Sequence, residues 1–308
     1  MNPSFDIIVD SAANLTDDMV AQTGIKMIPY ICTVDGVDTA CYENGVKFAD
    51  IAKSFYSKMA AGADIKTSLI GEERIIEAVT PSMEQGRDVL FITIASALSG
   101  TYAQALNAQK TLSEKYNNCK LYVVESANAS LGEGLLAIHA AKLRDLGESA
   151  EDACAWVEDN KYKMNSYLTV DDLKHLRRGG RISTTLAIAG TLLNIKPIIR
   201  ADGGSPAKLA FFGKERGRKR ALEKLADYFT QNVINPENQT VAIAHTDCAE
   251  DAEKLGEPLA EKPVTLAIGE VVGGKVEVDR ADLYNALNAN ERKMALEASI
   301  QALTAAEE

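Results

Sequence analysis

Short apolar segments rich in β-branched residues alternate with longer segments of helical periodicity through the first half of the chain. Three apolar segments, at residues 5–10, 89–94 and 120–125, each lead into a small polar loop and then into a helical pattern. Strands that alternate with helices in this way indicate a parallel sheet with helices packed on its faces. We therefore predict an α/β fold with a doubly wound parallel sheet for this half.

The pattern changes near Ser166, which we take as the boundary between two domains, residues 1–165 and residues 166–308. In the second domain, the apolar segments predict a hairpin and then two strands with a helix between them. These segments are residues 197–203, 206–213, 239–246 and 264–272. The arrangement is typical of an α+β domain with a mixed sheet. From about residue 281 an alanine-rich pattern predicts an added amphipathic helix.

Composition and charge limit the possible functions. The 308 residues include 33 lysines and arginines and 44 aspartates and glutamates, which gives a net charge of −11. This charge argues against nucleic acid or an anionic membrane as the main partner. The five cysteines are widely separated and form no C-x-x-C motif, so neither a disulfide framework nor a zinc site is indicated. No apolar run approaches the roughly 20 residues of a membrane span, and we expect a cytoplasmic protein.

Polar residues follow the predicted parallel strands, at the edge where sheets of this kind bind ligands. The residues expected to gather there are Asp10, Ser11, Ser96, Ser99, Thr101, Glu125, Ser126 and Asn128. Ser99, Gly100 and Thr101 open a predicted helix, where free backbone N–H groups and the helix dipole favour an anion. Thr67 and Ser68 stand before another predicted helix and would bring a second N-terminus to the same crevice. The alternative for each hydroxyl pair is plain N-capping.

Several common catalytic motifs are absent from the sequence. There is no G-x-S-x-G sequence around any serine, no G-x-G-x-x-G after the first strand and no Walker A sequence. A serine hydrolase, a dinucleotide-binding enzyme and a nucleoside triphosphatase are therefore not favoured. We predict a binding protein without a metal or cofactor. The alternative is a small-molecule kinase or hydrolase that uses the hydroxyl crevice for an anionic substrate.

Two basic clusters interrupt the acidic sequence. The first contains Arg177, Arg178 and Arg181, and the second spans residues 214–220. The second cluster leads into a predicted helix, and cations at a helix N-terminus are unfavourable unless an anion compensates them. We therefore predict that it docks an anionic partner, with a solvated basic turn balanced by nearby glutamates as the alternative. The candidate docking residues are Arg216, Arg218, Lys219 and Arg220.

Seven short motifs, in their order along the chain, resemble the DegV family of bacterial fatty-acid-binding proteins over nearly the whole length. They are D-S at Asp10 and Ser11, T-S at Thr67 and Ser68, L-S-G-T-Y at residues 98–102, E-S-A-N-A-S-L-G-E-G at residues 125–134, R-G-G-R-I-S at residues 178–183, L-L-N-I-K-P-I at residues 192–198 and R-x-R-K-x-A-L at residues 216–222. Their order, rather than any single motif, carries the resemblance.

The resemblance implies two α/β domains with one long-chain fatty acid in a tunnel between them. It implies that the carboxylate is held by the hydroxyl groups of Thr67, Ser68, Ser99 and Thr101. We add Gly100, Ser126 and Arg181 as candidate contacts. Some members of the family serve as the acyl-carrying subunit of a fatty acid kinase and present the carboxylate to a separate ATP-binding subunit. A lipid sensor without a kinase partner is a further alternative.

Two features depart from the family pattern. Leu69 and Ile70 follow the T-S pair, where the family commonly has Gln-Pro or a similar pair, and the C-terminal His-x-Gly-Pro-Gly element with its carboxylate-binding histidine is missing. The apolar segments at residues 135–143 and 186–195 are candidates for the tunnel wall. Apolar helices more often pack in a core, which is the alternative for both segments.

Overall fold

The structure, a computed structural model, describes residues 4–15, 17–41, 49–182, 194–202, 208–261, 265–272 and 275–280. Its N-terminal part is built on a four-stranded parallel sheet of order β2-β1-β6-β7. The strands are β1 (Phe5–Asp10), β2 (Lys26–Ile28), β6 (Asp88–Thr93) and β7 (Leu121–Glu125). The helices of this part are η1 (Ser11–Ala13), α1 (Asp17–Thr23), α3 (Glu72–Met83), α4 (Thr101–Lys115), α5 (Leu131–Asp145), α6 (Ala150–Asn160) and η2 (Lys161–Lys163).

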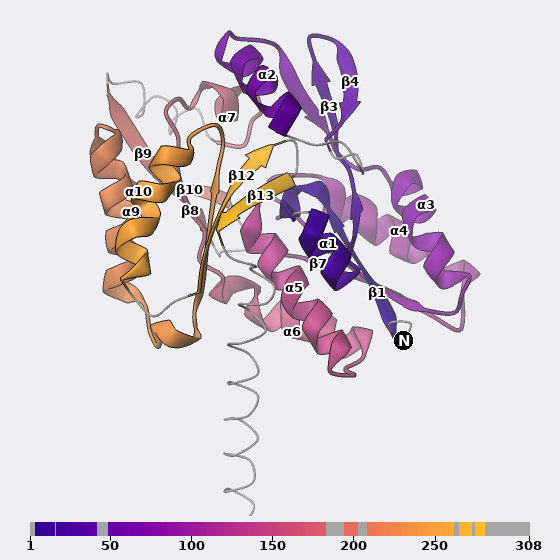
Figure 1. The fold of residues 1–308 in the computed structure, drawn as a ribbon. Coiled ribbons are helices and arrows are strands. Elements are labelled where there is room, and N and C mark those ends of the chain that lie inside the picture. Colours follow the sequence, from indigo (N-terminus) through magenta and orange to yellow (C-terminus); the bar gives the residue numbers. More distant parts are fainter. Residues whose placement is uncertain are drawn as a thin grey trace, which may run out of the picture.

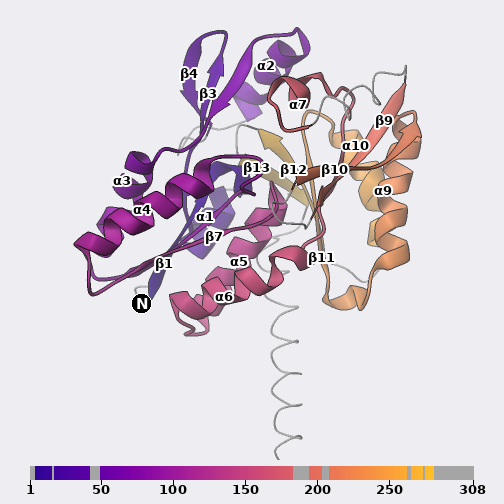
Figure 2. The same ribbon diagram turned by 180° about the vertical axis from the view of Figure 1, so that it is seen from behind.

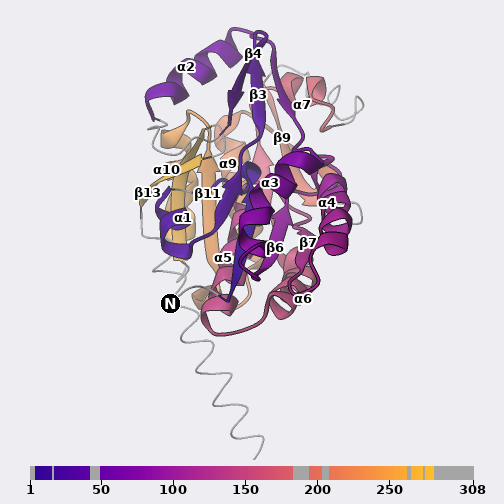
Figure 3. The same ribbon diagram turned by 90° about the vertical axis from the view of Figure 1, so that its right-hand side faces the viewer.

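Helices cover both faces of this sheet (Figure 1 and Figure 3). In β1, Phe5, Ile7 and Val9 pack with residues of α5 and α6, whereas Ile8 packs with residues of α3 and α4. Because β1 is buried on both faces, its sequence is a continuous apolar run and not an alternating one. The predicted doubly wound parallel sheet is confirmed.

A second, antiparallel sheet stands at the carboxyl ends of the parallel strands, near the top of Figure 1. Its strands are β3 (Ile31–Val34), β4 (Val37–Ala40) and β5 (Ile65–Ser68), in the order β4-β3-β5. Helix α2 (Ala49–Ala60) connects β4 to β5 along the chain, and the short helix α7 (Lys174–Arg178) lies at the same end of the molecule. The sequence does not predict this sheet, because strands of four residues carry too little periodicity to be recognised.

The C-terminal part contains two three-stranded sheets (Figure 2). The first is antiparallel and consists of β8 (Tyr167–Thr169), β9 (Ile195–Asp202) and β10 (Lys208–Arg216). The second is mixed and consists of β11 (Thr240–His245), β12 (Thr265–Val272) and β13 (Lys275–Arg280). The helices are α9 (Arg218–Asn232), η3 (Pro236–Asn238) and α10 (Ala249–Ala260). The predicted α+β class with a hairpin and a mixed sheet is confirmed.

Three further predictions concern segments rather than sheets. Residues 135–143 belong to α5 and pack in the core beside β1, so the core alternative applies to this segment. The predicted helix from residue 281 and most of the segment 186–195 lie outside the described residues. The boundary at Ser166 stays a prediction. Among the helices of the described ranges, none combines the length and apolar character that crossing a bilayer requires.

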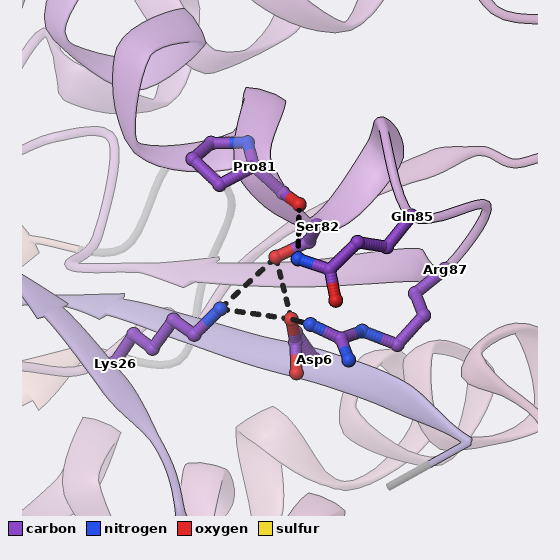
Figure 4. Close-up of polar contacts among 6 residues, drawn as sticks. All are labelled: Asp6, Lys26, Pro81, Ser82, Gln85 and Arg87. Carbon is purple, nitrogen blue, oxygen red and sulfur yellow. Dashed lines mark hydrogen bonds and ion pairs between the residues drawn. The ribbon is translucent and has the colours of Figure 1, made fainter. Parts of the chain in front are cut away.

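One buried carboxylate joins three segments at the amino end of the parallel sheet (Figure 4). Asp6 of β1 accepts hydrogen bonds from Lys26 Nζ at 2.8 Å, Ser82 Oγ at 2.5 Å and Arg87 Nη2 at 3.1 Å. Lys26 belongs to β2, Ser82 to the end of α3 and Arg87 to the turn before β6. Burial alone would raise the pKa of Asp6, but the hydrogen bonds and the two cations outweigh burial and lower it. The carboxylate is therefore stabilised in its charged form by three separate segments.

Asp6→Asn is expected to lower the free energy of unfolding at pH 7 by about 1.5–3 kcal/mol, the usual value of hydrogen bonds to a charged group. The reason is that Lys26 and Arg87 lose their buried counter-charge. Because the pKa is lowered on folding, this stabilisation is present above the ordinary value of 3.8 and is lost as the pH falls through the folded value. Denaturant titration at pH 7 and pH 3 measures both effects.

Asp64→Asn is the matched control for this experiment. Asp64 pairs with Lys66 at 2.6 Å, and both side chains are more than half exposed, at 64% and 71%. An exposed ion pair contributes at most about 1 kcal/mol, so this variant should change stability little. Equal decreases in the free energy of unfolding for the two variants would contradict the structural role of Asp6.

Candidate functional site

A cavity of about 850 Å³ lies at the carboxyl end of the parallel sheet, between the sheet β4-β3-β5 and the segment around α7. Its volume is within the range of roughly 300–1,000 Å³ that is typical of small-molecule sites. Both parts of the chain contribute to its wall. The apolar residues of the wall include Val34, Val37, Phe55, Met59, Leu176 and Leu209. Such a wall suits a ligand with a long apolar portion.

Three hydroxyl groups form a cluster at one side of this cavity. Tyr30 Oη donates to Ser99 Oγ at 3.2 Å and lies 3.0 Å from Thr101 Oγ1, and the two smaller hydroxyls are 2.9 Å apart. Thr101 is fully buried, and its hydroxyl accepts the backbone N–H of Ile70 at 3.2 Å. Tyr30 and Ser99 line the cavity, so the cluster brings polar groups to the space that a ligand would occupy.

The directions of these hydrogen bonds leave the Ser99 proton available to a ligand. Tyr30 donates to Ser99, and in the contact between Tyr30 and Thr101 either hydroxyl can be the donor. Ser99 can then turn its own proton either to Thr101 or to an acceptor in the cavity. A carboxylate is a stronger acceptor than a hydroxyl, so the cluster can offer an anion one well-oriented donor.

Thr67 and Ser68 also line the cavity, but they reach it in a different way from the predicted one. They are the last two residues of β5, which pairs with β3. Helix α3 begins only at Glu72, after Gly71 as its N-cap, and no side chain caps it. The capping alternative is therefore wrong for this pair, and a strand rather than a helix N-terminus brings the two residues to the wall.

The predicted helix start beside Ser99 is confirmed. Helix α4 begins at Thr101 and has Gly100 at its N-cap position. Because glycine has no side chain, the N-cap residue makes no side-chain capping bond. A Cβ atom on Gly100 would lie 3.1 Å from Leu69 Cδ2, so a glycine fits this close approach. Leu69 is 47% exposed and lines the cavity, which means that the N-terminus of α4 lies directly behind the cavity wall.

Arg181 lies just after α7, where it lines the cavity and donates from Nε to the carbonyl of Leu98 at 3.2 Å. This bond holds a cation beside the loop that carries Ser99. Arg177 and Arg178 end α7 and are not among the lining residues.

Of the other polar residues of the predicted crevice, Ser11 lines the cavity, whereas four in the loops after β6 and β7 bond to one another instead: Ser96, Glu125, Ser126 and Asn128. The Ser126 hydroxyl is buried in the turn after β7. It donates to the carbonyl of Asn128 and accepts the backbone N–H of Asn128, both at 3.1 Å. Glu125 accepts the backbone N–H of Ser96 at 2.6 Å. These contacts fix the loops at the ends of β6 and β7. A ligand contact by Ser126 stays a prediction.

Two carboxyl groups are buried behind the cavity. Asp10, at the end of β1, accepts the backbone N–H groups of Ala12 and Ile94, both at 2.9 Å. Burial nevertheless raises the pKa of Asp10 to about 6. Glu133, in the first turn of α5, is fully buried, and within the described part of the chain neither of its carboxylate oxygens has a hydrogen-bond partner. Burial, together with the nearby charge of Asp10, raises the pKa of Glu133.

Some wall residues have no signal in the sequence. Tyr30 follows Pro29 between two short strands, and its hydroxyl partners lie 69 and 71 positions away. Cys32, Cys41 and His175 also line the cavity. No local motif marks these residues, because the contacts that bring them together are set by the tertiary fold. In the described ranges, no group of three or more His, Cys, Asp or Glu side chains could hold a metal ion.

The buried carboxyl groups predict an unusual dependence of stability on pH. Folding raises both pKa values, so the folded state keeps protons that the unfolded chain releases, and stability falls as the pH rises. For Asp10, a pKa that moves from 3.8 to about 6 corresponds to a loss of about 3 kcal/mol across this interval. Glu133→Gln should therefore stabilise the protein at pH 8 and have a smaller effect at pH 4.

Denaturant titrations at these two pH values measure the difference. Glu114→Gln, at an exposed position of α4, is the control and should leave the pH dependence unchanged. A stabilisation by Glu133→Gln that is the same at both pH values would show that ionisation of the buried carboxyl has no part in it.

Comparisons with known proteins identify one family. The family model with the description "Uncharacterised protein, DegV family" matches residues 4–278. A DegV domain-containing protein of Clostridium perfringens is 40% identical over 258 residues, which cover 84% of this chain and 87% of that protein. The chain is also similar to two solved structures. A DegV family protein from Ruminococcus gnavus, refined with vaccenic acid, is 26% identical with a TM-score of 0.75, covering 88% of this chain and 95% of that one.

The second structure is the Fatty Acid Kinase (Fak) B3 protein of Streptococcus pneumoniae, loaded with linoleic acid. It is 18% identical with a TM-score of 0.74, covers 87% of this chain and 93% of its own, and shares the fold. The family match therefore extends over both parts of the chain and includes the residues around the cavity. This chain belongs to the DegV family.

Proposed function

We propose that this protein binds one long-chain fatty acid in the cavity and presents its carboxylate to a separate ATP-binding kinase subunit, which forms the acyl phosphate. One observation carries the proposal. The wall of the cavity is largely apolar, yet the residues that line it include Ser99, Thr67, Ser68 and Arg181. An apolar space with a few polar groups fits a ligand that has a long chain and one charged end.

The acyl chain supplies the binding energy. Each buried methylene contributes about 0.8 kcal/mol, so fourteen of them contribute roughly 11 kcal/mol before the cost of ordering the ligand. The apolar wall formed by β3, β4, α2 and α7 can therefore bind a fatty acid without many polar contacts. The head group then sets orientation more than affinity.

The carboxylate needs replacement for the water that it loses. Hydroxyl donors such as Ser99 make charge-assisted hydrogen bonds to a carboxylate, and Ser99, which accepts from Tyr30, lines the cavity. Such donors hold the anion without transferring a proton to it. A carboxylate oxygen therefore keeps its lone pairs for attack on a phosphoryl group supplied by a second protein. Proximity of Arg181 adds electrostatic attraction.

The similar structures support a lipid ligand and a kinase partner. Vaccenic acid accompanies the Ruminococcus gnavus protein, and linoleic acid is loaded in the Streptococcus pneumoniae protein, whose name places it with fatty acid kinase. In this reading the chain itself is a non-catalytic carrier. An enzyme that acts alone on an anionic substrate, or a lipid sensor, would differ in turnover and in partner dependence.

Roughly one fatty acid per chain should co-purify, because the tail alone supports micromolar or tighter binding. Ser99→Ala combined with Thr67→Val should then weaken fatty acid affinity, since each lost hydrogen bond to a charged group contributes on the order of 1.5–3 kcal/mol. Tyr30→Phe keeps the Ser99 hydroxyl but removes the donor that orients it, so its affinity should lie between the wild type and the double variant. Mass spectrometry of the denatured protein and titration calorimetry measure these outcomes.

Ser113→Ala is the matched control, because it removes an exposed hydroxyl that bonds the Lys110 carbonyl within α4. Circular dichroism verifies that each variant folds. Purification of the wild type with no lipid or only polar metabolites would contradict the lipid ligand. An unchanged dissociation constant for the folded double variant would contradict the role of the two hydroxyls.

The docking cluster divides into two kinds of cation. Arg218 contacts Asp171 at 2.7 Å and also contacts Asp251. These carboxylates of the same chain compensate the positive charge at the N-terminus of α9. Arg216, Lys219 and Arg220 are exposed. We therefore propose that the exposed cations dock an acidic face of the kinase subunit, while Arg218 joins α9 to its neighbours.

Arg216→Glu with Arg220→Glu should slow association with the kinase subunit and weaken its dependence on salt, as expected for an electrostatically steered encounter. Fatty acid affinity should stay unchanged, because neither side chain lines the cavity. Acyl phosphate formation is measured with the kinase subunit across a range of ionic strength. Lys110→Glu with Lys115→Glu makes the same change in charge on α4 and is the control.

The two double variants separate docking from general charge. A similar loss of acyl phosphate formation in both would indicate a net-charge effect and contradict docking at α9. Loss of fatty acid binding in the α9 variant would show that its arginines stabilise the fold instead.

A further inference from the structure

Two of the five cysteines lie close together in the wall of the cavity. Cys32 belongs to β3, the middle strand of its sheet, and Cys41 directly follows β4. Cys32 is paired with Thr39, and the backbone N–H of Cys41 donates to the carbonyl of Tyr30 at 2.7 Å. Cys41 is therefore two residues beyond the position opposite Cys32, which makes the two cysteines diagonal neighbours on one face of the hairpin.

The two thiols contact each other through a hydrogen bond from Cys41 to the sulfur of Cys32. This bond lowers the pKa of Cys32 and raises the pKa of Cys41. The guanidinium of Arg74, which donates to the carbonyl of Pro29 at 2.8 Å, places a positive charge near Cys41. One sulfur is thus suited to react as a thiolate, and its neighbour keeps a proton.

The other three cysteines have different surroundings. Cys119 is buried and donates to the carbonyl of Met83 at 3.4 Å. Cys154 and Cys248 are half-buried, and burial raises the pKa of both thiols. Among the described residues, none of these three lines the cavity. They are internal references for the reactivity of the pair.

We propose that Cys32 and Cys41 form a dithiol site that reacts with a peroxide in the cavity and closes to a disulfide. First, the Cys32 thiolate attacks one peroxide oxygen and the O–O bond breaks. The departing oxygen takes a proton and leaves as water or an alcohol, and Cys32 becomes a sulfenic acid. Then the Cys41 sulfur attacks the Cys32 sulfur, the S–O bond breaks, and the hydroxyl group leaves as water with the Cys41 proton. Two electrons pass from the dithiol to the peroxide.

The position of the pair connects this reaction to the ligand, and this connection rests on the proposed function. On the other side of β3, Cys32 is paired with Thr67 of β5, a proposed contact of the carboxylate. A fatty acid in the cavity therefore covers the dithiol. The peroxide can be hydrogen peroxide or a fatty acyl hydroperoxide, which would bring its own O–O bond to the sulfurs.

The reaction is tested on lipid-free full-length protein with one equivalent of hydrogen peroxide. Non-reducing peptide mass spectrometry should find a bond between Cys32 and Cys41, formed about tenfold faster than modification of Cys154 or Cys248, as expected for a thiolate against raised-pKa thiols. Cys41→Ser should stop at a Cys32 sulfenic acid that dimedone traps, and Cys32→Ser should form no disulfide. Cys154→Ser is the matched control and should react as the wild type does.

Oxidation of Cys154 or Cys248 before the pair, or a lasting sulfenic acid on Cys32 in the wild type, would overturn the proposal. A second arm repeats the reaction with saturating stearic acid, whose binding is measured separately by calorimetry. Slower formation of the Cys32–Cys41 bond in the presence of stearic acid supports the placement of the dithiol in the ligand cavity. An unchanged rate with the acid bound overturns this placement. Failure of the acid to bind contradicts the proposed function alone, because the first arm still decides the dithiol chemistry.

A third arm uses linoleic acid hydroperoxide in place of hydrogen peroxide. A faster reaction than with hydrogen peroxide identifies the acyl hydroperoxide as the better source of the O–O bond. A slower reaction with the acyl hydroperoxide identifies hydrogen peroxide as the better oxidant. Absence of the Cys32–Cys41 bond with both oxidants overturns the proposal.

Discussion

The Tyr30 hydroxyl lies between Ser99 and Thr101, and the wall of the cavity depends on this contact. The Thr101 hydroxyl is buried away from water, so its hydrogen bonds come from its protein neighbours, whereas Tyr30 and Ser99 also line the cavity. The backbone N–H of Tyr30 in turn donates to Ser11 Oγ at 3.0 Å, and that of Ile70 donates to Thr101. One small cluster thereby joins the end of β1, the start of β3, the approach to α3 and the N-terminus of α4. The orientation of the ligand-facing hydroxyl is set by the core and not by a flexible loop.

Buried carboxyl groups at the two ends of the parallel sheet have pKa values shifted in opposite directions. At the amino end, Asp6 is surrounded by cations and a hydroxyl, and its pKa is lowered. At the carboxyl end, no cation is among the causes of the Asp10 shift and Glu133 has no hydrogen-bond partner among the described residues, and burial raises both pKa values. The amino end is therefore arranged for stability. The carboxyl end gives up stability beside the cavity, which is the usual place for such exceptions.

Much of the fold follows from the sequence, because strands buried on both faces and the helices between them leave long, unambiguous patterns. The sheet β4-β3-β5 cannot be predicted from the sequence in this way. Because Thr67 and Ser68 belong to that sheet, the sequence does not predict how they reach the cavity either. Their hydroxyls line the cavity, but through strand β5 and not through a helix N-terminus. Arg218 shows the same limit: its charge needs a compensating anion, and local sequence cannot reveal that Asp171 and Asp251 of the same chain supply it.

A strained turn and the buried Glu133, which has no hydrogen-bond partner in the described part of the chain, lie close together at the start of α5. Helix α5 approaches the segment after β1 so closely that a Cβ atom on Gly134 would lie 2.5 Å from the carbonyl of Ala13. Glu133, next to Gly134, is fully buried, and Ser130 in the preceding turn has a φ of 56° and a ψ of −143°. Such a conformation persists in a residue other than glycine only when its surroundings enforce it. Ser130 and Asn14 both line the cavity. Two residues with costly backbone conformations therefore form part of the cavity wall on this side.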